Sequence, residues 1–239
     1  MNKPSQVLIA LLITSTVFFS GCKKENKITK QKIEMESIDL RKAATFAVLS
    51  GAEVTNTGGT VITGDLGLSP GTSVGGFPPG EINGTLRIND EIANQAKLDL
   101  TTAYNDAAGR SSKDMVSLSG NIGGLTLTPG LYKSTSSLEI SSGDVTFDAK
   151  GDANAVFIIQ IASSLTTTPG RKVILKGSAS ASNIFWQVSS SASFGTTSVF
   201  KGTIMALESI TFDTGATLDG KALARNGAVT LDGNTIVKK

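Results

Sequence analysis

The residue types that carry most enzyme chemistry are nearly absent from this sequence. The 239-residue chain contains no histidine and a single cysteine, Cys22. Ser-His-Asp and Cys-His catalysis are therefore excluded, as is histidine-ligated zinc or haem. One cysteine also excludes an internal disulfide and a cysteine-rich metal cluster. We expect a protein that is not an enzyme and that holds neither a metal nor a cofactor.

Carboxylates offer two further candidate sites. Asp144, Asp148 and Asp152 are four residues apart, and the stretch from Asp148 to Asn154 weakly resembles a calcium-binding loop. Calcium needs about 6–8 oxygen ligands, and this stretch lacks a suitably placed bidentate glutamate. A turn with Asp and Asn at its corners is favoured instead. Glu139 and Asp144 could form a hydrolase pair, but carboxylates this close in sequence are common by chance, so we predict no catalytic site.

Threonine gives the more informative pattern. Two motifs share the form Thr-Gly-x-Thr: Thr57-Gly-Gly-Thr60 and Thr214-Gly-Ala-Thr217. Aligning the repeat described below adds two weaker motifs, Thr196-Thr-Ser198 and Gly233-Asn-Thr235. A glycine corner followed by a strand threonine explains any one motif by itself. In register, however, stacked coils would place equivalent residues ~4.8 Å apart, and alternate residues of a strand ~6.5–7 Å apart. Because β-branched rotamers are stiff, the pattern predicts a flat, rigid lattice of hydroxyl and methyl groups.

The elements that position these threonines are short strands in a repeat. Phe200-Lys-Gly202 recurs as Leu218-Asp-Gly220 after 18 residues, and Ile210-Thr-Phe-Asp213 recurs as Val229-Thr-Leu-Asp232 after 19. This period suits one coil of a β-solenoid, whereas a β-sandwich is the alternative fold. The repeat and the single helix favour the solenoid. We expect these side chains to point inward: Phe157, Phe185, Phe194, Phe200, Phe212, Val156 and Ile204. Trp186 is also expected in the core.

One helix is predicted, from Asp90 to Ala108. Its apolar residues recur at spacings of three and four, on the stripe Ile92, Ala96, Leu100, Ala103/Tyr104 and Ala107. Asn89 can cap its start, and Gly109 ends it. Because only one stripe is apolar, this helix must lie against another element.

The N-terminal sequence indicates a targeting segment. Residues 1–21 have an early Lys3 and an apolar run from Val7 to Phe19, which is typical of a signal peptide. Ser20-Gly21-Cys22 resembles the lipobox of bacterial lipoproteins, so we expect cleavage before Cys22 and lipid on its sulfur and amine. Ordinary secretion with cleavage nearby is the alternative. Both interpretations predict an exported protein, and the first predicts a lipoprotein of the cell envelope or cell surface held to a membrane by lipid on Cys22.

Residues 22–42 are expected to be a flexible tether, and residues 43–239 a single domain. Residues 23–42 carry seven Lys/Arg and four Asp/Glu, and lack an apolar pattern before Ile38. The chain has a net charge of +2, of which Lys3 contributes +1 and the tether +3, so the domain carries −2. A weakly acidic domain lacks the excess of positive charge that is typical of nucleic-acid-binding proteins.

The chain resembles the microbial β-helical ice-binding proteins. The resemblance runs through residues 43–237 in order, on seven segments: Ala52-Glu-Val-Thr-Asn-Thr-Gly58, Gly64-Asp-Leu-Gly-Leu-Ser-Pro-Gly71, Gly75-Gly-Phe-Pro-Pro-Gly80, Ala153-Asn-Ala-Val-Phe157, Ser182-Asn-Ile-Phe-Trp-Gln-Val188, Phe200-Lys-Gly-Thr-Ile-Met-Ala206 and Leu223-Ala-Arg-Asn-Gly-Ala-Val-Thr-Leu231. It implies a mainly β fold, a right-handed β-solenoid (β-helix) of roughly 18–19-residue coils with one long α-helix packed alongside. It also implies that the N-terminal coil lies beside the C-terminal ones.

The resemblance further implies binding to an ice crystal surface. The family's ice-contacting motifs carry over to Thr57, Thr60, Thr214 and Thr217, with weaker extensions at Thr196, Ser198 and Thr235. Adsorption through a flat threonine-rich face would inhibit ice growth and recrystallisation, giving thermal hysteresis in a cold-adapted organism. The alternatives are a cell-surface adhesin or polysaccharide-binding solenoid, and a polysaccharide lyase or hydrolase. We expect a monomer.

The sequence departs from this family in one region. Some members carry a disulfide-bonded cap between the first coil and the helix, and this chain has no cysteine there. Any cap must therefore be held by packing of Phe77, Pro78, Pro79 and Ile82.

Overall fold

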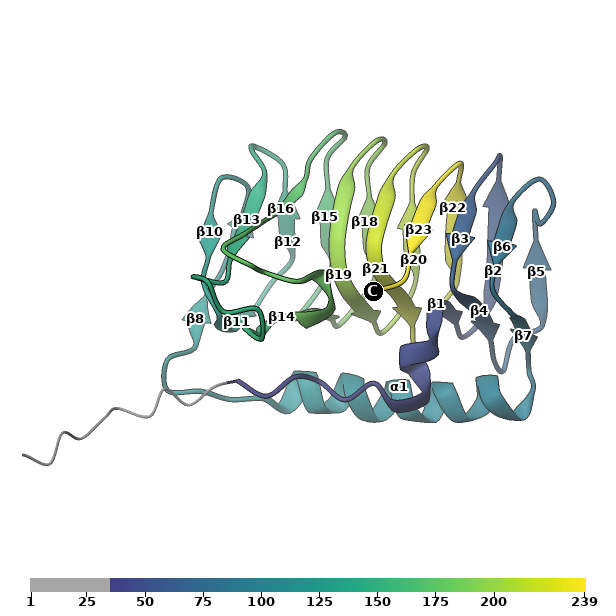
Figure 1. The fold of residues 1–239 in the computed structure, drawn as a ribbon, viewed down its shortest axis with the longest axis horizontal. Helices are drawn as coiled ribbons and strands as arrows, with labels where there is room; N and C mark the ends of the chain where they lie inside the picture. The colour runs from purple at the N-terminus through teal and green to yellow at the C-terminus, as the bar shows by residue number, and fades with distance from the viewer. Residues whose placement is uncertain (1–34) are drawn as a thin grey trace, which may run out of the picture. The chain divides into compact units, whose positions relative to one another are not determined.

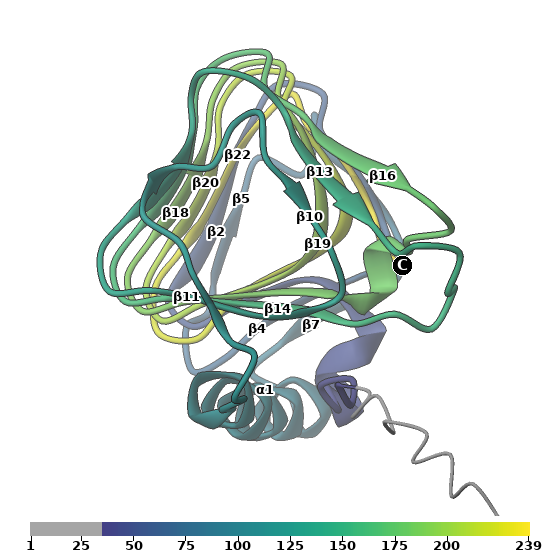
Figure 2. The same ribbon diagram turned by 90° about the vertical axis from the view of Figure 1, so that its left-hand side faces the viewer.

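Parallel strands wind around a triangular cross-section, and one long helix runs along one side (Figures 1 and 2). The computed structural model describes residues 35–239, so the proposed signal peptide, Cys22 and the first part of the tether lie outside the described residues. The fold is mainly β with one long helix, as the sequence predicted.

Three faces enclose the core, and each is a row of parallel strands. The eight-strand sheet has the order β5 (Ser73–Gly75), β2 (Glu53–Thr57), β22 (Val229–Asp232), β20 (Ile210–Phe212), β18 (Ala192–Phe194), β15 (Leu165–Thr167), β12 (Leu138–Ile140) and β9 (Gly120–Asn121).

The helix face lies beside the helix and consists of β7 (Leu86–Ile88), β4 (Asp65–Leu68), β1 (Phe46–Ser50), the second halves of β21 (Thr217–Ala224) and β19 (Val199–Ala206), then β17 (Ile184–Val188), β14 (Phe157–Ile161), β11 (Gly130–Ser134) and β8 (Val116–Ser117).

The third face consists of β6 (Glu81–Asn83), β3 (Val61–Thr63), β23 (Thr235–Val237) and the first halves of β21 and β19, then β16 (Val173–Lys176), β13 (Val145–Asp148) and β10 (Thr126–Leu127). Strands β19 and β21 turn the corner between two faces at Gly202 and Gly220. A Cβ at Gly220 would lie 2.0 Å from the Gly202 carbonyl oxygen, so glycine is required there.

The strand register gives two coil lengths. In the last third of the chain, Val199 pairs with Thr217 and Ile210 pairs with Val229, which defines short coils. In the middle of the chain, Phe157 pairs with Ile184, so a coil there is half as long again. The period predicted from the repeat is therefore wrong for the middle coils. Their extra residues, 149–156 and 177–183, the latter including a short 3-10 helix (Ala181–Asn183), form loops between the third face and the helix face.

The first coils lie beside the last ones, as the resemblance implied. Val48 of β1 pairs with Ala222 of β21, and Val54 of β2 pairs with Val229 of β22. Thr235 of β23 pairs with Val61 of β3. The first and last coils are far apart in sequence, yet they are neighbours in one continuous stack (Figure 1).

The apolar residues form two cores because the helix face is buried on both sides. Phe157, Phe194, Phe200, Phe212 and Ile204 fill the triangle as predicted, together with Trp186. The predicted inward positions of Phe185 and Val156 are wrong. Both residues instead belong to a second core between the helix face and the helix.

Helix α1 (Glu91–Gly109) runs along the helix face and buries one stripe against it. Ile92 is exposed and Ala93 takes its place in that stripe, contrary to the predicted register. The cap is Asp90 rather than Asn89, because the Asp90 carboxylate accepts a hydrogen bond of 2.7 Å from the Ala93 N–H. No helix within residues 35–239 is both long and apolar enough to cross a membrane.

Three polar side chains tie the helix to the coils. The Lys97 ammonium donates to the Ala224 and Arg225 carbonyl oxygens, both at 2.5 Å. Gln160 Nε2 donates to the Ala107 carbonyl oxygen at 2.8 Å, and Gln187 Nε2 donates to the Tyr104 hydroxyl at 2.8 Å. These bonds satisfy backbone and side-chain groups that the packing removes from water.

The folded part begins before residue 43. Ile38 and Leu40 are buried in the second core, followed by a short 3-10 helix (Arg41–Thr45). The Lys42 N–H donates to Asp99 of the helix at 3.1 Å. The predicted tether therefore does not extend to residue 42, because apolar burial holds its last residues.

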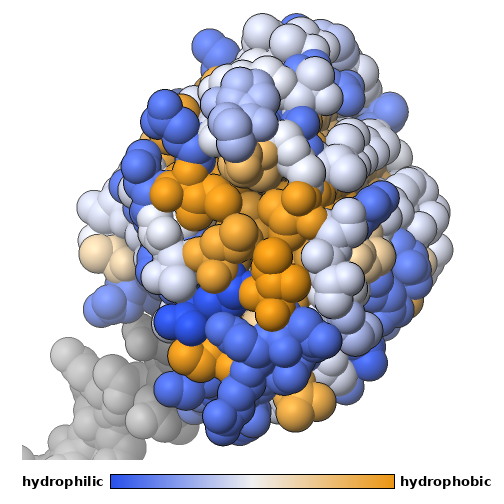
Figure 3. All heavy atoms as spheres, turned by 90° about the vertical axis from the view of Figure 1, so that its right-hand side faces the viewer, coloured by the Kyte–Doolittle hydropathy of each residue, from blue (hydrophilic) through white to orange (hydrophobic). Residues whose placement is uncertain are grey.

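The coil of β5, β6 and β7 closes one end of the stack. Phe77 and Ile82 pack partly against the core, whereas Pro78 and Pro79 are exposed and do not belong to it. Hydrophobic side chains gather on this end of the molecule (Figure 3). The predicted packing is thus right for Phe77 and Ile82 and wrong for the two prolines.

A polar pair is buried at the corner between the eight-strand sheet and the third face. The Asn234 N–H donates to Thr60 Oγ1 at 2.9 Å, and Asn234 Nδ2 donates to the Asp213 and Ala216 carbonyl oxygens, both at 2.9 Å. Thr60 and Ser198 are both 0 % exposed. Their predicted place on an outer surface is therefore wrong, because both side chains lie inside the corner.

We expect the free energy of unfolding to rise between about pH 7 and pH 10. Burial, together with the nearby Arg225 charge, lowers the pKa of Lys97 from 10.5 to about 7. Burial also lowers the pKa of Lys221. In that pH range the unfolded chain binds more protons than the folded one, so stability increases with pH. Urea titrations at pH 7 and pH 9.5 measure the slope.

The Lys97→Met variant is the control for this slope. It retains the length and apolar stem of the side chain but removes the titrating group, so the pH dependence should become shallower. A variant with the slope of the unmodified protein would contradict the assignment to Lys97.

Thr60→Val should destabilise the fold by about 1–3 kcal/mol, because it leaves the buried Asn234 N–H without an acceptor. The matched change Thr57→Val, at an exposed position, should cost no more than about 0.5 kcal/mol. Urea unfolding measures both, and equal losses would show that the Thr60 hydroxyl is not structural.

Candidate functional site

The carboxylates considered for catalysis or calcium binding serve turns. Asp148 accepts hydrogen bonds from the Lys150 N–H at 2.9 Å and from its ammonium at 2.7 Å. Asp152 accepts from the Asn154 N–H at 2.9 Å, and Asp144 accepts from the Lys172 N–H at 2.9 Å. Within residues 35–239, no three His, Cys, Asp or Glu side chains are placed to hold a metal ion.

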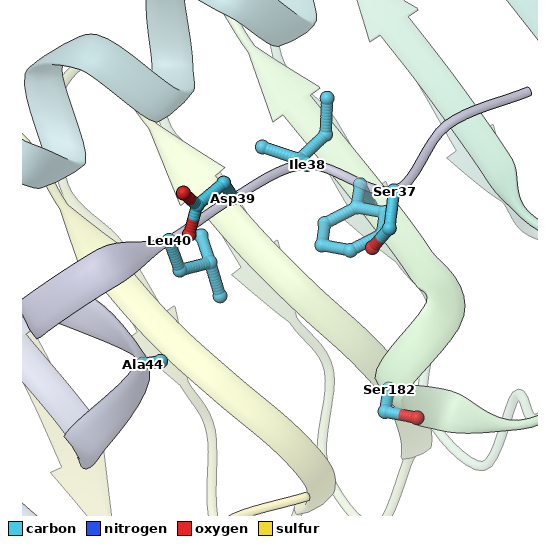
Figure 4. Close-up of a pocket in the computed structure, with 7 residues that line it drawn as sticks. Ser37, Ile38, Asp39, Leu40, Ala44 and Ser182 are labelled. Atoms are coloured by element: carbon cyan, nitrogen blue, oxygen red, sulfur yellow. The ribbon is translucent and has the colours of Figure 1, made fainter.

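A groove of about 360 Å³ lies beside residues 37–44, lined by Ser37, Ile38, Asp39, Leu40, Ala44, Ser182 and Phe185 (Figure 4). Asp39 is its one ionisable side chain, and its hydroxyl groups come from Ser37 and Ser182. The groove offers no pair of groups for acid–base chemistry and no nucleophile beside a base.

The outer surface of the eight-strand sheet carries a continuous column of hydroxyl side chains. The strand pairing places five of them in adjacent coils, in the order Thr166, Ser193, Thr211, Thr230 and Thr55. Glu139 and then Asn121 precede them, and Gly75 follows. We call these eight residues the central column. Equivalent residues of neighbouring strands lie ~4.8 Å apart, which sets the repeat of the column.

A second column lies two residues earlier on each strand. It consists of Ser137, Ser164, Ser191, Ser209, Ala228 and Glu53. Ser137 Oγ and Ser164 Oγ are 2.9 Å apart, and Ser191 Oγ accepts from the Ser209 N–H at 3.3 Å. The two columns together form a grid of small polar side chains with a spacing of ~6.5–7 Å across it.

The other two faces do not offer such a surface. Helix α1 covers the helix face (Figure 2). The third face carries ion pairs on its strands, with the Lys201 ammonium 3.4 Å and the Lys239 ammonium 3.5 Å from the Asp219 carboxylate. The two columns of the eight-strand sheet contain no Lys or Arg and only two carboxylates, Glu53 and Glu139.

Three of the predicted site residues meet at the edge of this sheet. Thr57, Thr196 and Thr214 are exposed at the corner toward the third face. Backbone hydrogen bonds stack this corner coil on coil, from Gly233 N–H to the Thr57 carbonyl at 2.8 Å and from Thr197 N–H to the Thr214 carbonyl at 3.0 Å. Asp232 stands between Thr57 and Thr214 in the stack, and its carboxylate accepts a hydrogen bond from the Thr214 hydroxyl.

Two others lie on the third face. Thr217 and Thr235 are direct partners in neighbouring strands, flanked by Val199 and Val61. The two Thr-Gly-x-Thr motifs are therefore not equivalent in space, since Val61, and not Thr60, aligns with Thr217. Thr55 to Val61 and Thr211 to Thr217 both span six residues, so Thr60 is equivalent to the buried Ala216 and lies in the interior beside Asn234.

The Thr-Gly-x-Thr motifs do not reveal the central column. Its signal is present in the repeat Ile210-Thr-Phe-Asp213 and Val229-Thr-Leu-Asp232, where threonine alternates with buried apolar residues. That alternation places Thr211 and Thr230 outward. Leu165-Thr166-Thr167 and Ala192-Ser193-Phe194 have the same alternation.

Comparison with known proteins gives a consistent result. The model of the Ice-binding-like family matches residues 48–237. An ice-binding protein of Nostoc sp. is 45% identical over 227 residues, which cover 94% of this chain and 81% of the relative. One from Flavobacterium frigoris is 36% identical over 230 residues, covering 91% of this chain and 82% of the relative.

Solved structures agree with the sequence relatives. The crystal structure of an ice-binding protein from an Antarctic biological consortium superimposes with a TM-score of 0.86 at 75% identity, covering 87% of this chain and 93% of that one. The family match spans the three-faced stack from its first strand to its last. This chain belongs to the Ice-binding-like family.

Proposed function

We propose that this protein binds ice, and that the outer surface of the eight-strand sheet makes the contact. The observation that carries the proposal is the run of five hydroxyl residues in register in the central column. Its backbone is fixed by parallel pairing on both sides of each strand, so the surface is rigid before any ligand arrives. The names of the relatives support ice as the ligand.

The chemistry of the grid suits an ordered water layer. Threonine methyl groups make water order over them, while hydroxyl groups anchor that water by hydrogen bonds. Each contact is weak, but many act together, and stiff β-branched rotamers lose little entropy on binding. Adsorbed protein makes the ice front bulge between anchored molecules, which opposes growth and recrystallisation and gives thermal hysteresis. This action requires no catalytic step, so the protein is not proposed to be an enzyme.

The exposed threonines predicted from the motifs extend this surface. Thr57, Thr196 and Thr214 border the eight-strand sheet at its corner, so they can share the water layer of the central column. Thr217 and Thr235 face the adjacent side and would contact ice only if the corner itself docks. We propose the three corner threonines as part of the contact and the other two as a lateral extension.

A polysaccharide-binding module has no support among the described residues. Sugar platforms expose aromatic rings, whereas Trp186 and the stacked Phe194 and Phe212 are fully or almost fully buried. The two phenylalanine rings are 4.6 Å apart at their centroids and serve the core.

We also propose how the protein is made and placed. The coils form a right-handed solenoid, because parallel crossover connections are right-handed in about 98% of cases. Residues 1–21 direct export, and Cys22 carries the lipid of an envelope or cell-surface lipoprotein. The folded domain acts as a monomer at the end of a tether shorter than the sequence indicated, because Ile38 and Leu40 are packed.

Thr211→Lys should greatly reduce ice binding and leave the fold intact, because it places a long charged side chain in the centre of the grid. Thr102→Lys, on the exposed side of the helix, is the matched control. Uptake of the purified protein into a slowly growing ice hemisphere measures binding, and thermal melting checks the fold. Thr217→Lys, in the same assay, decides whether the third face takes part. Undiminished uptake of a folded Thr211→Lys variant would rule out the eight-strand sheet as the contact.

Cys22→Ser should release the protein from the membrane fraction of expressing bacterial cells, because it removes the proposed lipid attachment site. Metabolic labelling with a fatty acid should mark the unmodified chain and not the variant. A soluble, unlabelled unmodified chain would show ordinary secretion instead.

A further inference from the structure

The central column is interrupted by a single charged residue. Glu139 stands between Asn121 and Thr166, and the other seven positions of the column hold Thr, Ser, Asn or Gly. Five hydroxyl residues in register lie on one side of it. On the other side, Asn121 is the last residue of the column, at the far end of the stack from β5.

The backbone does not end where the hydroxyl residues end. Strand β12 pairs with β15 over three residues, and it has the same alternation of buried and exposed positions as β15 and β18. The second column also continues across this pair, since Ser137 Oγ lies 2.9 Å from Ser164 Oγ. The sheet is therefore continuous through Glu139, and the side chain alone changes the surface.

The Glu139 carboxylate is held on this surface. Ser141, two residues later on the same side of the strand, donates its hydroxyl to Glu139 Oε1 at 3.0 Å. Within residues 35–239, no Lys or Arg lies within salt-bridge distance of Glu139. An exposed and unneutralised carboxylate keeps its own hydration shell, because removing water from a charge is costly.

We propose that Glu139 sets the edge of the ice-binding surface and so limits its area to the coils from β15 to β2. This inference rests on the proposed function. A carboxylate orders water radially around its charge, which conflicts with a layer ordered over hydroxyl and methyl groups. Its longer side chain also rises above the level of threonine. Replacing it with threonine would add a sixth hydroxyl residue in register with Thr166.

Glu139→Thr in the full chain should increase thermal hysteresis and uptake into an ice hemisphere at equal protein concentration. If one further contact gains about 0.4 kcal/mol, ice affinity rises about twofold. Glu139→Gln keeps the shape and removes the charge, so it should give a smaller increase. Glu81→Thr makes the same substitution at an exposed strand position of the third face, and it should change neither thermal hysteresis nor uptake into ice.

The outcomes separate this inference from the proposed function. Suppose that Thr211→Lys loses ice binding while a folded Glu139→Thr variant shows unchanged or reduced binding. That result overturns only the role of Glu139 and leaves the ice-binding surface in place. Retained binding by Thr211→Lys overturns the ice-binding surface itself. An equal increase from Glu81→Thr would assign the effect to net charge and also overturn the inference. If Glu139→Thr does not fold, the isosteric Glu139→Gln decides, with no increase counting against the proposal.

Discussion

Coil-on-coil register is the constraint on which this structure depends. Each strand pairs in parallel with the strand above and the strand below, so equivalent residues of successive coils form columns. Inside the triangle, the column of Leu165, Ala192 and Ile210 builds the core. On the outside, the same pairing lines up Thr166, Ser193 and Thr211. A rigid outer grid is therefore a direct consequence of the packed interior, and the surface needs no separate means of alignment.

The coils differ in length, and the place of the extra residues protects the grid. Long and short coils follow one another without a break in the eight-strand sheet, where Thr166 pairs with Ser193 and Ser193 with Thr211. The additional residues, 149–156 and 177–183, lie at the corner between the other two faces. At the edges of the eight-strand sheet the turns differ by a single residue, and the central column stays in register. The large differences in coil length thus lie at a corner away from the eight-strand sheet.

The helix removes one face from solvent and fixes the order of the stack. Because α1 covers the helix face, the central strands β1, β14 and β17 are buried on both sides, and Phe185 and Val156 contribute to the second core. Gln160 binds the helix end, and Lys97 binds carbonyl groups near the end of β21. The helix also spans the distance between β7 and β8, at opposite ends of the stack (Figure 1). It thereby allows the first coils to lie beside the last.

The sequence by itself determined the fold class, the helix and the class of ligand. Missing histidine excluded most catalysis, the short repeat indicated coils, and ordered motifs indicated the family. Only the tertiary structure decided which hydroxyl groups share a surface. Thr57-Gly-Gly-Thr60 and Thr214-Gly-Ala-Thr217 have similar sequences, but they are offset by one residue in the stack. Thr60 is equivalent to the buried Ala216, whereas Thr217 is equivalent to Val61 on the third face. Face assignment depends on pairing register, and register is set by strands that are distant in sequence.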